Sequence, residues 1–396
     1  MDSGRPEHAL LLLGARRQLS AEESAVFKNL LAEPLDWRLL LQMADRHRIL
    51  ALLYSSLERE GCLCMVPRAV LDSLCAAVRL RVARTMALNG ELARILASFE
   101  RLGIPAMPCK GPAVAMAAYG SISFRSFCDL DILVPESHLS LGSEALGTLG
   151  YRPALRFTAE QERSYVENEC AMQFRDESRG FVVELHWRFC ERNASVDLPL
   201  TAFWHRAGRI ALPGHEASTL ATEDLLLYLC VHGAKHCWER IEWITCLAEV
   251  IRTNPSLDWP AVLARAESLG ILRLLHLGLY LAQSQGAELP GAVKRSLESD
   301  SAARRLAARV HAELFVTPSG QSHYQLRASR YLFMMRSRER WADRARILFY
   351  SAIRPPHPEA NEWMQLPPQL AFLHRVFRPV RLLTEYSLVA WRHYVR

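Results

Sequence analysis

The spacing of apolar side chains along this chain changes between a helical and a strand-like pattern. Residues 20–57 and 67–101 carry leucine and alanine at helical spacing, and Ser20 with Glu23 forms a capping box at the start of the first stretch. Residues 176–180, Asp-Glu-Ser-Arg-Gly, have the composition of a hairpin turn. Shorter apolar runs predict strands at 104–107, 129–134, 171–175 and 181–189.

The pattern becomes helical again after the last predicted strand. Thr222 to Asp224 caps a strongly apolar helix over 225–231, and the chain from Leu257 onward is mostly helical. A loop before a last helix at 370–395 is marked by Pro355, Pro356, Pro358, Pro367 and Pro368. This order predicts an α/β (α+β) fold in three parts: a helical N-terminal region (1–100), a core with a small sheet (101–210) and a helical C-terminal region (211–396).

The composition is that of a globular chain with ample material for a core, since half of the 396 residues are hydrophobic. The sequence shows neither a basic and apolar leader nor the roughly 18 to 20 apolar residues that span a bilayer, so we expect a cytoplasmic protein without a transmembrane segment. The ten cysteines are scattered and form no Cys-x-x-Cys pair. We therefore expect buried reduced thiols, with neither disulfides nor a zinc cluster.

Two carboxylates at the start of the strand predicted at 129–134 form the first candidate site. Side chains two positions apart in a strand project from the same face, so Asp129 and Asp131 lie side by side with Leu130 on the other face. Two neighbouring carboxylates repel each other unless a cation lies between them, and they suit a hard divalent cation such as Mg²⁺. An Asp-x-Asp pair is also common at solvated strand starts and turns, so the pair alone does not decide between the two.

The residues before this strand favour the metal site. Lys110 and Gly111 follow the apolar run at 104–107 and begin a predicted helix. Gly111 supplies backbone freedom and an open approach, and the N-terminal amides of the helix face any anion bound there. A phosphate site and a metal site are therefore expected to be adjacent.

These residues resemble the uncharacterised nucleotidyltransferases of the DNA polymerase β-like superfamily. In that superfamily a Gly-rich turn and a helix precede a strand with Asp-x-Asp, and a third carboxylate comes from a later neighbouring strand. The usual Gly-Ser of the turn is replaced here by Lys-Gly. The resemblance implies a small mixed β-sheet nucleotidyltransferase core embedded in extensive helical N- and C-terminal regions. It is carried by Lys110-Gly111, Tyr119-Gly120, Arg125 and Asp129 to Val134.

Glu184 is the candidate for the third carboxylate. In the strand predicted at 181–189, Val182, Glu184 and His186 share one face, and the residues between them share the other. Glu184 is thus a lone carboxylate inside an apolar run, with a histidine beside it. A glutamate facing water on an edge strand is the alternative, but Trp187 and the β-branched neighbours favour a sheet interior. The family resemblance also covers this Glu-x-His-Trp segment.

The resemblance implies nucleotidyl transfer assisted by metal ions. Asp129, Asp131 and Glu184 are expected to hold two Mg²⁺ ions, with an NTP, expected to be ATP, as co-substrate. A hydroxyl acceptor attacks the α-phosphate and pyrophosphate leaves, while Glu184 completes the second metal site or takes the acceptor's proton. Lys110 and Arg125 are expected to neutralise the departing phosphates, with a clamp on the loop as the other role for Arg125.

A second candidate segment contains two histidines. His232 and His236 are four residues apart, as zinc-ligand pairs are, but Gly233 stands where the zinc-protease motif has its glutamate, which argues against zinc. The family has a similar His-rich segment before a helix that contains tryptophan. Lys235 and His236 either line the nucleotide or acceptor pocket or belong to a helix that only packs on the sheet. Cys246 stands where the family pattern has an aspartate.

The distribution of charge along the chain gives only weak support for a nucleic-acid partner. The chain carries a net charge of +6, and residues 301–396 contain sixteen arginines and no lysine against six acidic residues, which gives 16 − 6 = +10. A basic face attracts nucleic acid or other anions. These arginines are interleaved with aromatic and aliphatic residues, however, and no recognition motif accompanies them. We therefore do not expect nucleic acid as the partner.

Two other function classes stay open at this point. One is a non-catalytic protein of the same fold that binds a nucleotide or substrate, for which the Cys246 replacement leaves room. The other is a phosphoryl-transfer hydrolase that uses the same metal pair. The acceptor of a transferase is a small molecule such as a sugar or an antibiotic-like compound, a peptide, a protein hydroxyl or, as the less expected case, RNA. The sequence does not distinguish among these.

Overall fold

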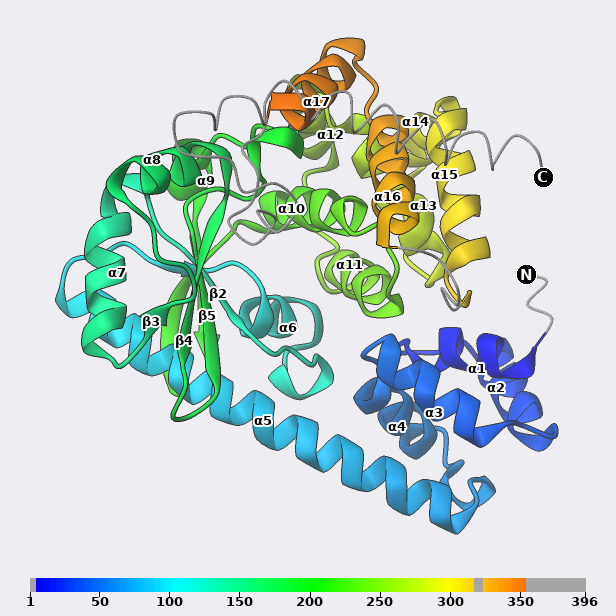
Figure 1. Cartoon of the computed structure of the whole chain (residues 1–396). Helices are drawn as coiled ribbons and strands as arrows, with labels where there is room; N and C mark the ends of the chain where they lie inside the picture. The colour runs from blue at the N-terminus through cyan, green and yellow to red at the C-terminus, as the bar shows by residue number, and fades with distance from the viewer. Residues whose placement is uncertain (1–4, 195, 317–322, 354–396) are drawn as a thin grey trace.

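The structure, a computed structural model, describes residues 5–194, 196–316 and 323–353 (Figure 1). Its strands are β1 Met107–Pro108, β2 Leu130–Leu133, β3 Arg152–Pro153, β4 Ala171–Asp176, β5 Phe181–His186, β6 Gly208–Leu212 and β7 His215–Thr219. Its N-terminal and core helices are α1 Pro6–Gly14, α2 Ala21–Ala32, α3 Trp37–Arg46, α4 Leu50–Arg59, α5 Arg68–Arg101, α6 Gly111–Tyr119, α7 Leu139–Thr148, α8 Ala159–Asn168 and α9 Leu200–Arg206. The C-terminal helices are α10 Thr222–Lys235, α11 Ile241–Thr253, α12 Trp259–Ser268, α13 Leu272–Ser284, α14 Gly291–Ser299, α15 Ser301–Glu313, α16 His323–Ser337 and α17 Trp341–Ile353.

Five strands form one sheet in the order β1-β2-β5-β4-β3. Strands β2 and β5 are parallel, and the other neighbours are antiparallel, so the sheet is mixed. The hairpin predicted at 176–180 joins β4 to β5, with Gly180 at a φ of 68° that favours glycine. The small mixed sheet within a largely helical chain confirms the predicted fold class.

The two faces of the sheet have different surroundings. Leu130, Ile132, Val183 and Leu185 point to one face, where they form a hydrophobic cluster with residues of α5 and α7. Leu133 points to the other face and joins a larger cluster that includes residues of α6 and α10. Figure 1 shows α5 and α7 on one side of the sheet and α6 and α10 on the other. The alternation predicted for residues 130–134 is therefore confirmed.

Helix α5 links the N-terminal helices to the sheet. It has 34 residues and is about 50 Å long at 1.5 Å per residue. Gly103 follows it with a φ of 67°, and the Ile104 amide donates to the Phe99 carbonyl over 2.9 Å, which terminates the helix. This bond keeps Ile104 at the end of the helix. The first strand consequently begins at Met107, and the strand predicted at 104–107 was wrong in its position.

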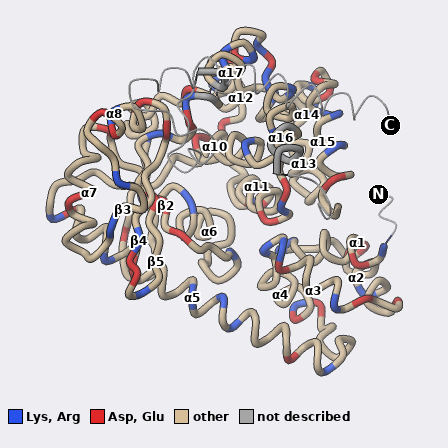
Figure 2. The backbone as a smooth tube through the Cα atoms, in the orientation of Figure 1, with Lys and Arg blue, Asp and Glu red and all other residues tan. Residues whose placement is uncertain are grey.

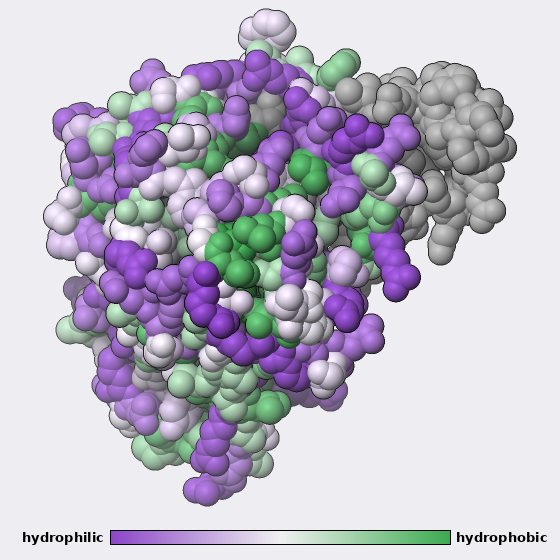
Figure 3. Space-filling view, turned by 90° about the vertical axis from the view of Figure 1, so that its left-hand side faces the viewer, coloured by the Kyte–Doolittle hydropathy of each residue, from purple (hydrophilic) through white to green (hydrophobic). Residues whose placement is uncertain are grey.

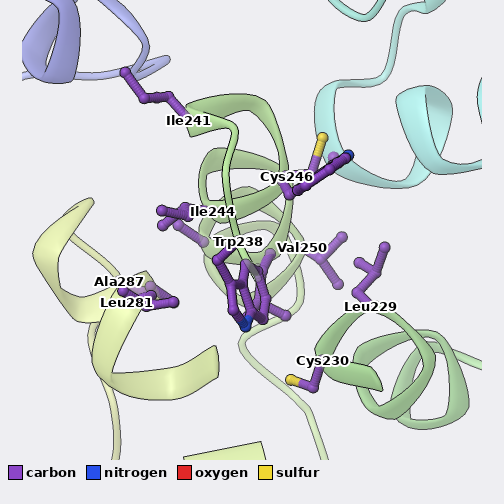
Figure 4. Packing of buried hydrophobic residues seen from close by; sticks show 14 of the residues in the cluster. Leu229, Cys230, Trp238, Ile241, Ile244, Cys246, Val250, Leu281 and Ala287 are labelled. Atoms are coloured by element: carbon purple, nitrogen blue, oxygen red, sulfur yellow. The ribbon is translucent and has the colours of Figure 1, made fainter. Parts of the chain in front are cut away.

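The C-terminal helices pack around Trp238, which is fully buried. Figure 4 shows its indole among side chains such as Leu229, Ile244 and Leu281, which come from α10, α11 and α13. The helices α1–α4 belong to the same hydrophobic cluster, so the start of the chain packs against its C-terminal helices. Stacking of His8 on Phe315, with ring centroids 4.1 Å apart, is one such contact.

Several elements were missed by the apolar pattern. Helix α1 was not predicted, and the stretch predicted as polar before Asn168 contains α8, which begins with a capping box of Thr158 and Gln161. Strands β6 and β7 form a separate two-stranded sheet that was also not predicted. The prolines and the last helix predicted at 370–395 lie outside the described residues. The division of the chain near residues 100 and 210 stays a prediction.

The surface near α7 and α8 is mostly hydrophilic, with hydrophobic residues gathered near the middle of that face (Figure 3). Among the helices of the described residues, none combines the length and apolar character that crossing a membrane requires. All ten cysteines are free thiols, and six of them are buried.

Candidate active site

Asp131 and Glu184 are partners across the parallel strands β2 and β5. Neighbouring strands lie about 4.8 Å apart, so paired side chains project together from one face. His186 projects from that face as well, with Nε2 3.0 Å from Asp131 Oδ1 and 3.4 Å from Glu184 Oε2. One ligand atom from each of these residues lies within 4.8 Å of the others, and among the described residues this is the group able to hold a metal ion.

Lys110 places a cation against this group. It precedes α6, and its Nζ lies 2.5 Å from Asp131 Oδ1. Gly111 adopts a φ of 50°, a left-handed conformation that favours glycine, and thereby turns the chain from β1 into α6. In the structure the ammonium group of Lys110 contacts an aspartate, and the role predicted for it with departing phosphates stays a prediction. Figure 2 shows basic and acidic positions side by side near β2 and α6.

The charges of this cluster stabilise one another. Burial favours a raised pKa for Asp131, but the Lys110 ammonium and the His186 ring hold that pKa well below its usual range. The hydrogen bond from His186 likewise lowers the pKa of Glu184. Burial favours a lowered pKa for His186. Its hydrogen bonds, of which the one to Asp131 has the largest effect, nevertheless raise the pKa well above the ordinary value. Both carboxylates are therefore ionised at neutral pH, and two cations balance them.

Asp129 lies one residue before β2 and lines the same cavity as Asp131 and Glu184. Burial raises the pKa of Asp129, and the negative charges of Asp131 and Glu184 raise it further. Its carboxylate is not part of the group whose ligand atoms lie within 4.8 Å. The sequence named Asp129 for this group and did not name His186, although it placed His186 on the face of Glu184.

A cavity of about 790 Å³ is lined by most of the residues that the sequence predicted for the site. Of those predicted to form the site, only Gly111 is not part of its wall. The wall also contains residues that the sequence did not single out, and no local motif marks them. The predicted residues that line the cavity are Lys110, Arg125, Asp129, Asp131, Glu184, Lys235 and His236. Those that sequence reasoning missed include Arg48, Arg152, Arg175, Glu191, Arg240 and Trp243.

Arg125 is buried in the loop before β2. Its Nε lies 3.3 Å from Glu242 Oε1 of α11, and its Nη1 donates to the Gly111 carbonyl over 3.5 Å. Glu242 is buried as well, with 1% of its side chain exposed. Of the two roles expected for Arg125, these contacts fit a clamp that fastens the loop to α11.

Lys235 and His236 lie at the end of α10. Lys235 Nζ pairs with Glu191 Oε1 over 2.7 Å. The His236 ring centroid is 4.7 Å from that of His232 and 5.2 Å from that of Trp243, and burial lowers the pKa of His236 to about 3. An uncharged imidazole and a paired lysine therefore stand in this part of the wall.

Gly233 departs from the zinc-protease motif for a steric reason. A Cβ atom at this position would lie 2.5 Å from the indole of Trp238, so no larger residue fits without displacing that ring. Among the described residues, no further metal ligand joins His232 and His236. The packing of Trp238 thus accounts for the glycine between these histidines.

Cys246 faces a buried polar group outside the cavity wall. Its Sγ lies 3.3 Å from Tyr119 Oη, and burial raises the pKa of the thiol to about 11. Arg125 lies close enough that its charge lowers that pKa in part. The carboxylate that contacts Arg125 is supplied by Glu242, one helical turn earlier in α11.

The comparison with protein families agrees with these features. The model of a family described as uncharacterised nucleotidyltransferase matches residues 33–285, which is more than half of the chain. No curated protein matches. Among solved structures the chain is similar to the solution structure of the antibiotic-resistance factor ANT(2'')-Ia, at 13% identity and a TM-score of 0.28, over 58% of this chain and 93% of that one. The chain therefore belongs to the uncharacterised nucleotidyltransferase family and is a nucleotidyltransferase.

Proposed function

We propose that this protein transfers a nucleoside monophosphate from an NTP to a hydroxyl group of an acceptor and releases pyrophosphate. The observation that carries the proposal is the meeting of Asp131, Glu184 and His186 in the wall of the cavity, with ligand atoms within 4.8 Å of one another. The family match supports the same reaction class.

The donor atoms fit a divalent cation. Carboxylate oxygens are the ligands that Mg²⁺ prefers. His186 Nε2 would have to lose its proton before it could join them, and the site would then also suit Mn²⁺. Asp131 Oδ1 already contacts the Lys110 ammonium, so a metal ion would have to compete with that ammonium for this oxygen. Asp129, Asp131 and Glu184 would hold Mg²⁺, with two ions proposed. When bound, the metal would neutralise phosphate charge and lower the pKa of the attacking hydroxyl.

The other roles in the proposed reaction are assigned to Glu184, Lys110 and Arg125. Glu184 has 29% of its side chain exposed against 4% for Asp131, so an acceptor hydroxyl can reach Glu184 and give up its proton there. Lys110 stands at the start of α6, where the N-terminal amides of the helix and its own ammonium attract the phosphates of the NTP. Arg125 keeps the loop before Asp129 in place through Glu242.

The substrates proposed for the cavity are ATP and a hydroxyl acceptor. Its volume of about 790 Å³ lies within the range of roughly 300 to 1,000 Å³ that small-molecule sites occupy. The acceptor is proposed to be a small molecule or an exposed hydroxyl of a peptide or protein that reaches into this space.

A transfer assay tests the proposal. The purified chain is incubated with Mg²⁺ or Mn²⁺, with each NTP labelled at the α-phosphate, and with a cell extract as the pool of acceptors. We expect equimolar pyrophosphate and labelled acceptor, and we expect Asp131→Asn to abolish both. The matched control is Asp72→Asn, which removes a carboxylate that is 59% exposed near the start of α5. Inorganic phosphate as the product would indicate hydrolysis, and nucleotide binding without any product would indicate a non-catalytic protein.

A further inference from the structure

Two arginines from distant parts of the sequence lie in the cavity wall with Asp129. Arg48 stands between α3 and α4, in the N-terminal helical region, and Arg240 stands directly before α11. Both side chains are half-buried. Neither belongs to a recognisable motif, and the fold alone brings them together.

A hydrogen bond between their sequence neighbours holds the two arginines in place. The Ile241 amide donates to His47 Nδ1 over 3.3 Å, and His47 is fully buried. Burial lowers the pKa of His47 to about 3, so its ring is neutral and Nδ1 is able to accept. Arg48 itself has a φ of 57°, a left-handed conformation that is rare for residues other than glycine. The position of Arg48 is therefore fixed by its surroundings.

The two side chains are also held. Arg48 donates from Nη1 to the Ser126 carbonyl over 3.5 Å and from Nη2 to Cys128 Sγ over 3.6 Å, which fastens it to the loop that leads into Asp129. The Arg240 guanidinium lies 5.1 Å from the centroid of the Trp243 ring. Both guanidinium groups are thus held beside the carboxylate site.

The neighbouring acids offset the charges of these arginines only in part. Within the described residues neither forms an ion pair, because the nearby glutamates pair elsewhere: Glu242 with Arg125, and Glu239 with Arg330 over 2.7 Å. Burial lowers the pKa of Arg240 and the charge of Arg48 lowers it further, while the charges of Glu242 and Glu239 raise it only in part. Two like charges held close together are unfavourable until an anion lies between them.

We propose that Arg48 and Arg240 bind the β- and γ-phosphates of the NTP, the part that leaves as pyrophosphate. This inference rests on the proposed function, because the anion must lie next to the carboxylates that hold the metal. Each guanidinium group matches phosphate oxygens through paired hydrogen bonds, and two such groups together suit the several negative charges of a polyphosphate. The helical N-terminal region thereby contributes a substrate-binding residue to the site.

Calorimetric titration tests the inference with three probes in the presence of Mg²⁺: inorganic pyrophosphate, AMP and ATP. Arg48→Gln and Arg240→Gln should each weaken the binding of pyrophosphate and of ATP by about 10- to 100-fold, the loss expected for a hydrogen bond to a charged group. The binding of AMP should not change. The matched control is Arg209→Gln, which removes a guanidinium from β6 that is 55% exposed, pairs with Glu216 and does not line the cavity. It should bind all three probes as the wild type does.

The outcomes separate this inference from the proposed function. Unchanged pyrophosphate affinity in both variants, or an equal loss for AMP, overturns the inference even if nucleotidyl transfer is observed. Loss of pyrophosphate binding in both variants supports the anion site even if the wild type transfers no nucleotide. Arg48→Lys, which keeps the charge but not the planar fork, should show a smaller loss than Arg48→Gln. Thermal unfolding of each variant verifies that the fold is intact.

Discussion

Asp131 and Glu184 stand opposite each other in the register of two parallel strands, and the Nε2 atom of His186 reaches both carboxylates. This relationship makes the positions of the two acids a property of the sheet itself. Because β2 is buried along its full length, its register is fixed by packing on both faces. The acids consequently meet without the help of a loop.

Glu184→Gln is expected to weaken the binding of Mn²⁺ strongly, because it removes one of the charged oxygen ligands from the group. Loss of a direct ligand should exceed the roughly 10- to 100-fold loss that follows removal of an outer partner of a metal site. The affinity is measured by titrating the purified protein with Mn²⁺, either by calorimetry or through the electron paramagnetic resonance signal of the unbound Mn²⁺. Glu136→Gln, which changes an exposed glutamate that pairs with Arg188, is the control.

Replacement of Lys110 should act in the opposite direction. Its ammonium competes with a metal ion for Asp131 Oδ1, so Lys110→Met should raise the affinity for Mn²⁺. Tighter binding in Glu184→Gln, or weaker binding in Lys110→Met, would contradict the assignment of this group as a metal site.

Removing only one member of the buried pair of Arg125 and Glu242 should lower the stability of the fold more than removing both. Glu242→Leu leaves a buried guanidinium without its carboxylate, which should cost about 3–5 kcal/mol in the free energy of unfolding. Arg125→Met combined with Glu242→Leu removes both charges and should cost clearly less than the sum of the two single changes. Denaturant titration measures all four proteins, and additive single effects would show that the two side chains do not interact.

The lowered pKa of the buried Glu91 carboxyl makes the stability of the fold depend on pH. Burial favours a raised pKa for this carboxyl, but hydrogen bonds from Arg94 and Tyr151 and the charges of Arg94 and Arg179 lower it below the ordinary value of 4.5. Tyr151 Oη lies 2.7 Å and Arg179 Nη1 2.8 Å from its oxygens. A carboxyl with a lowered folded-state pKa stabilises the fold above its unfolded pKa, and this contribution disappears as the pH falls through the folded value.

The free energy of unfolding should therefore fall as the pH drops below 4.5, and Glu91→Gln should show a smaller fall over that range. Denaturant titrations at a series of pH values measure the difference. Glu100→Gln changes an exposed glutamate on the same helix and should keep the pH dependence of the wild type. The same slope in Glu91→Gln and in the wild type would refute this account of Glu91.

The sequence predicted the parts of the fold that short periodicity determines. The alternation around Glu184 and the hairpin at 176–180 were confirmed, because a strand of period two and a turn are local properties. The first strand was misplaced, because the amide of Ile104 is taken up by the end of α5. Helix α8 was missed because its charged and polar residues give no apolar stripe, although Thr158 and Gln161 form a capping box.

The candidate site was predictable only where a motif is short and continuous. Asp129, Asp131 and Lys110 lie within one stretch of the sequence, and Glu184 follows in the next hairpin. The contact between Arg125 and Glu242, and the approach of Arg48 to Ser126, join residues far apart in the chain through helix packing. Side-chain periodicity holds no information on how distant helices meet, so these partners came only from the three-dimensional structure.

The composition of the cavity wall also determines which fragment is useful in the laboratory. Its residues come from the helical region before the sheet, from the sheet and the segments around its strands, and from α10, α11 and the turn between them. All of them lie inside residues 33–285. A shortened version that keeps only the strands would lack Arg48 and Arg240, two of the arginines in the cavity wall. Substrate screens should consequently begin with protein that retains the helical segments on both sides of the sheet.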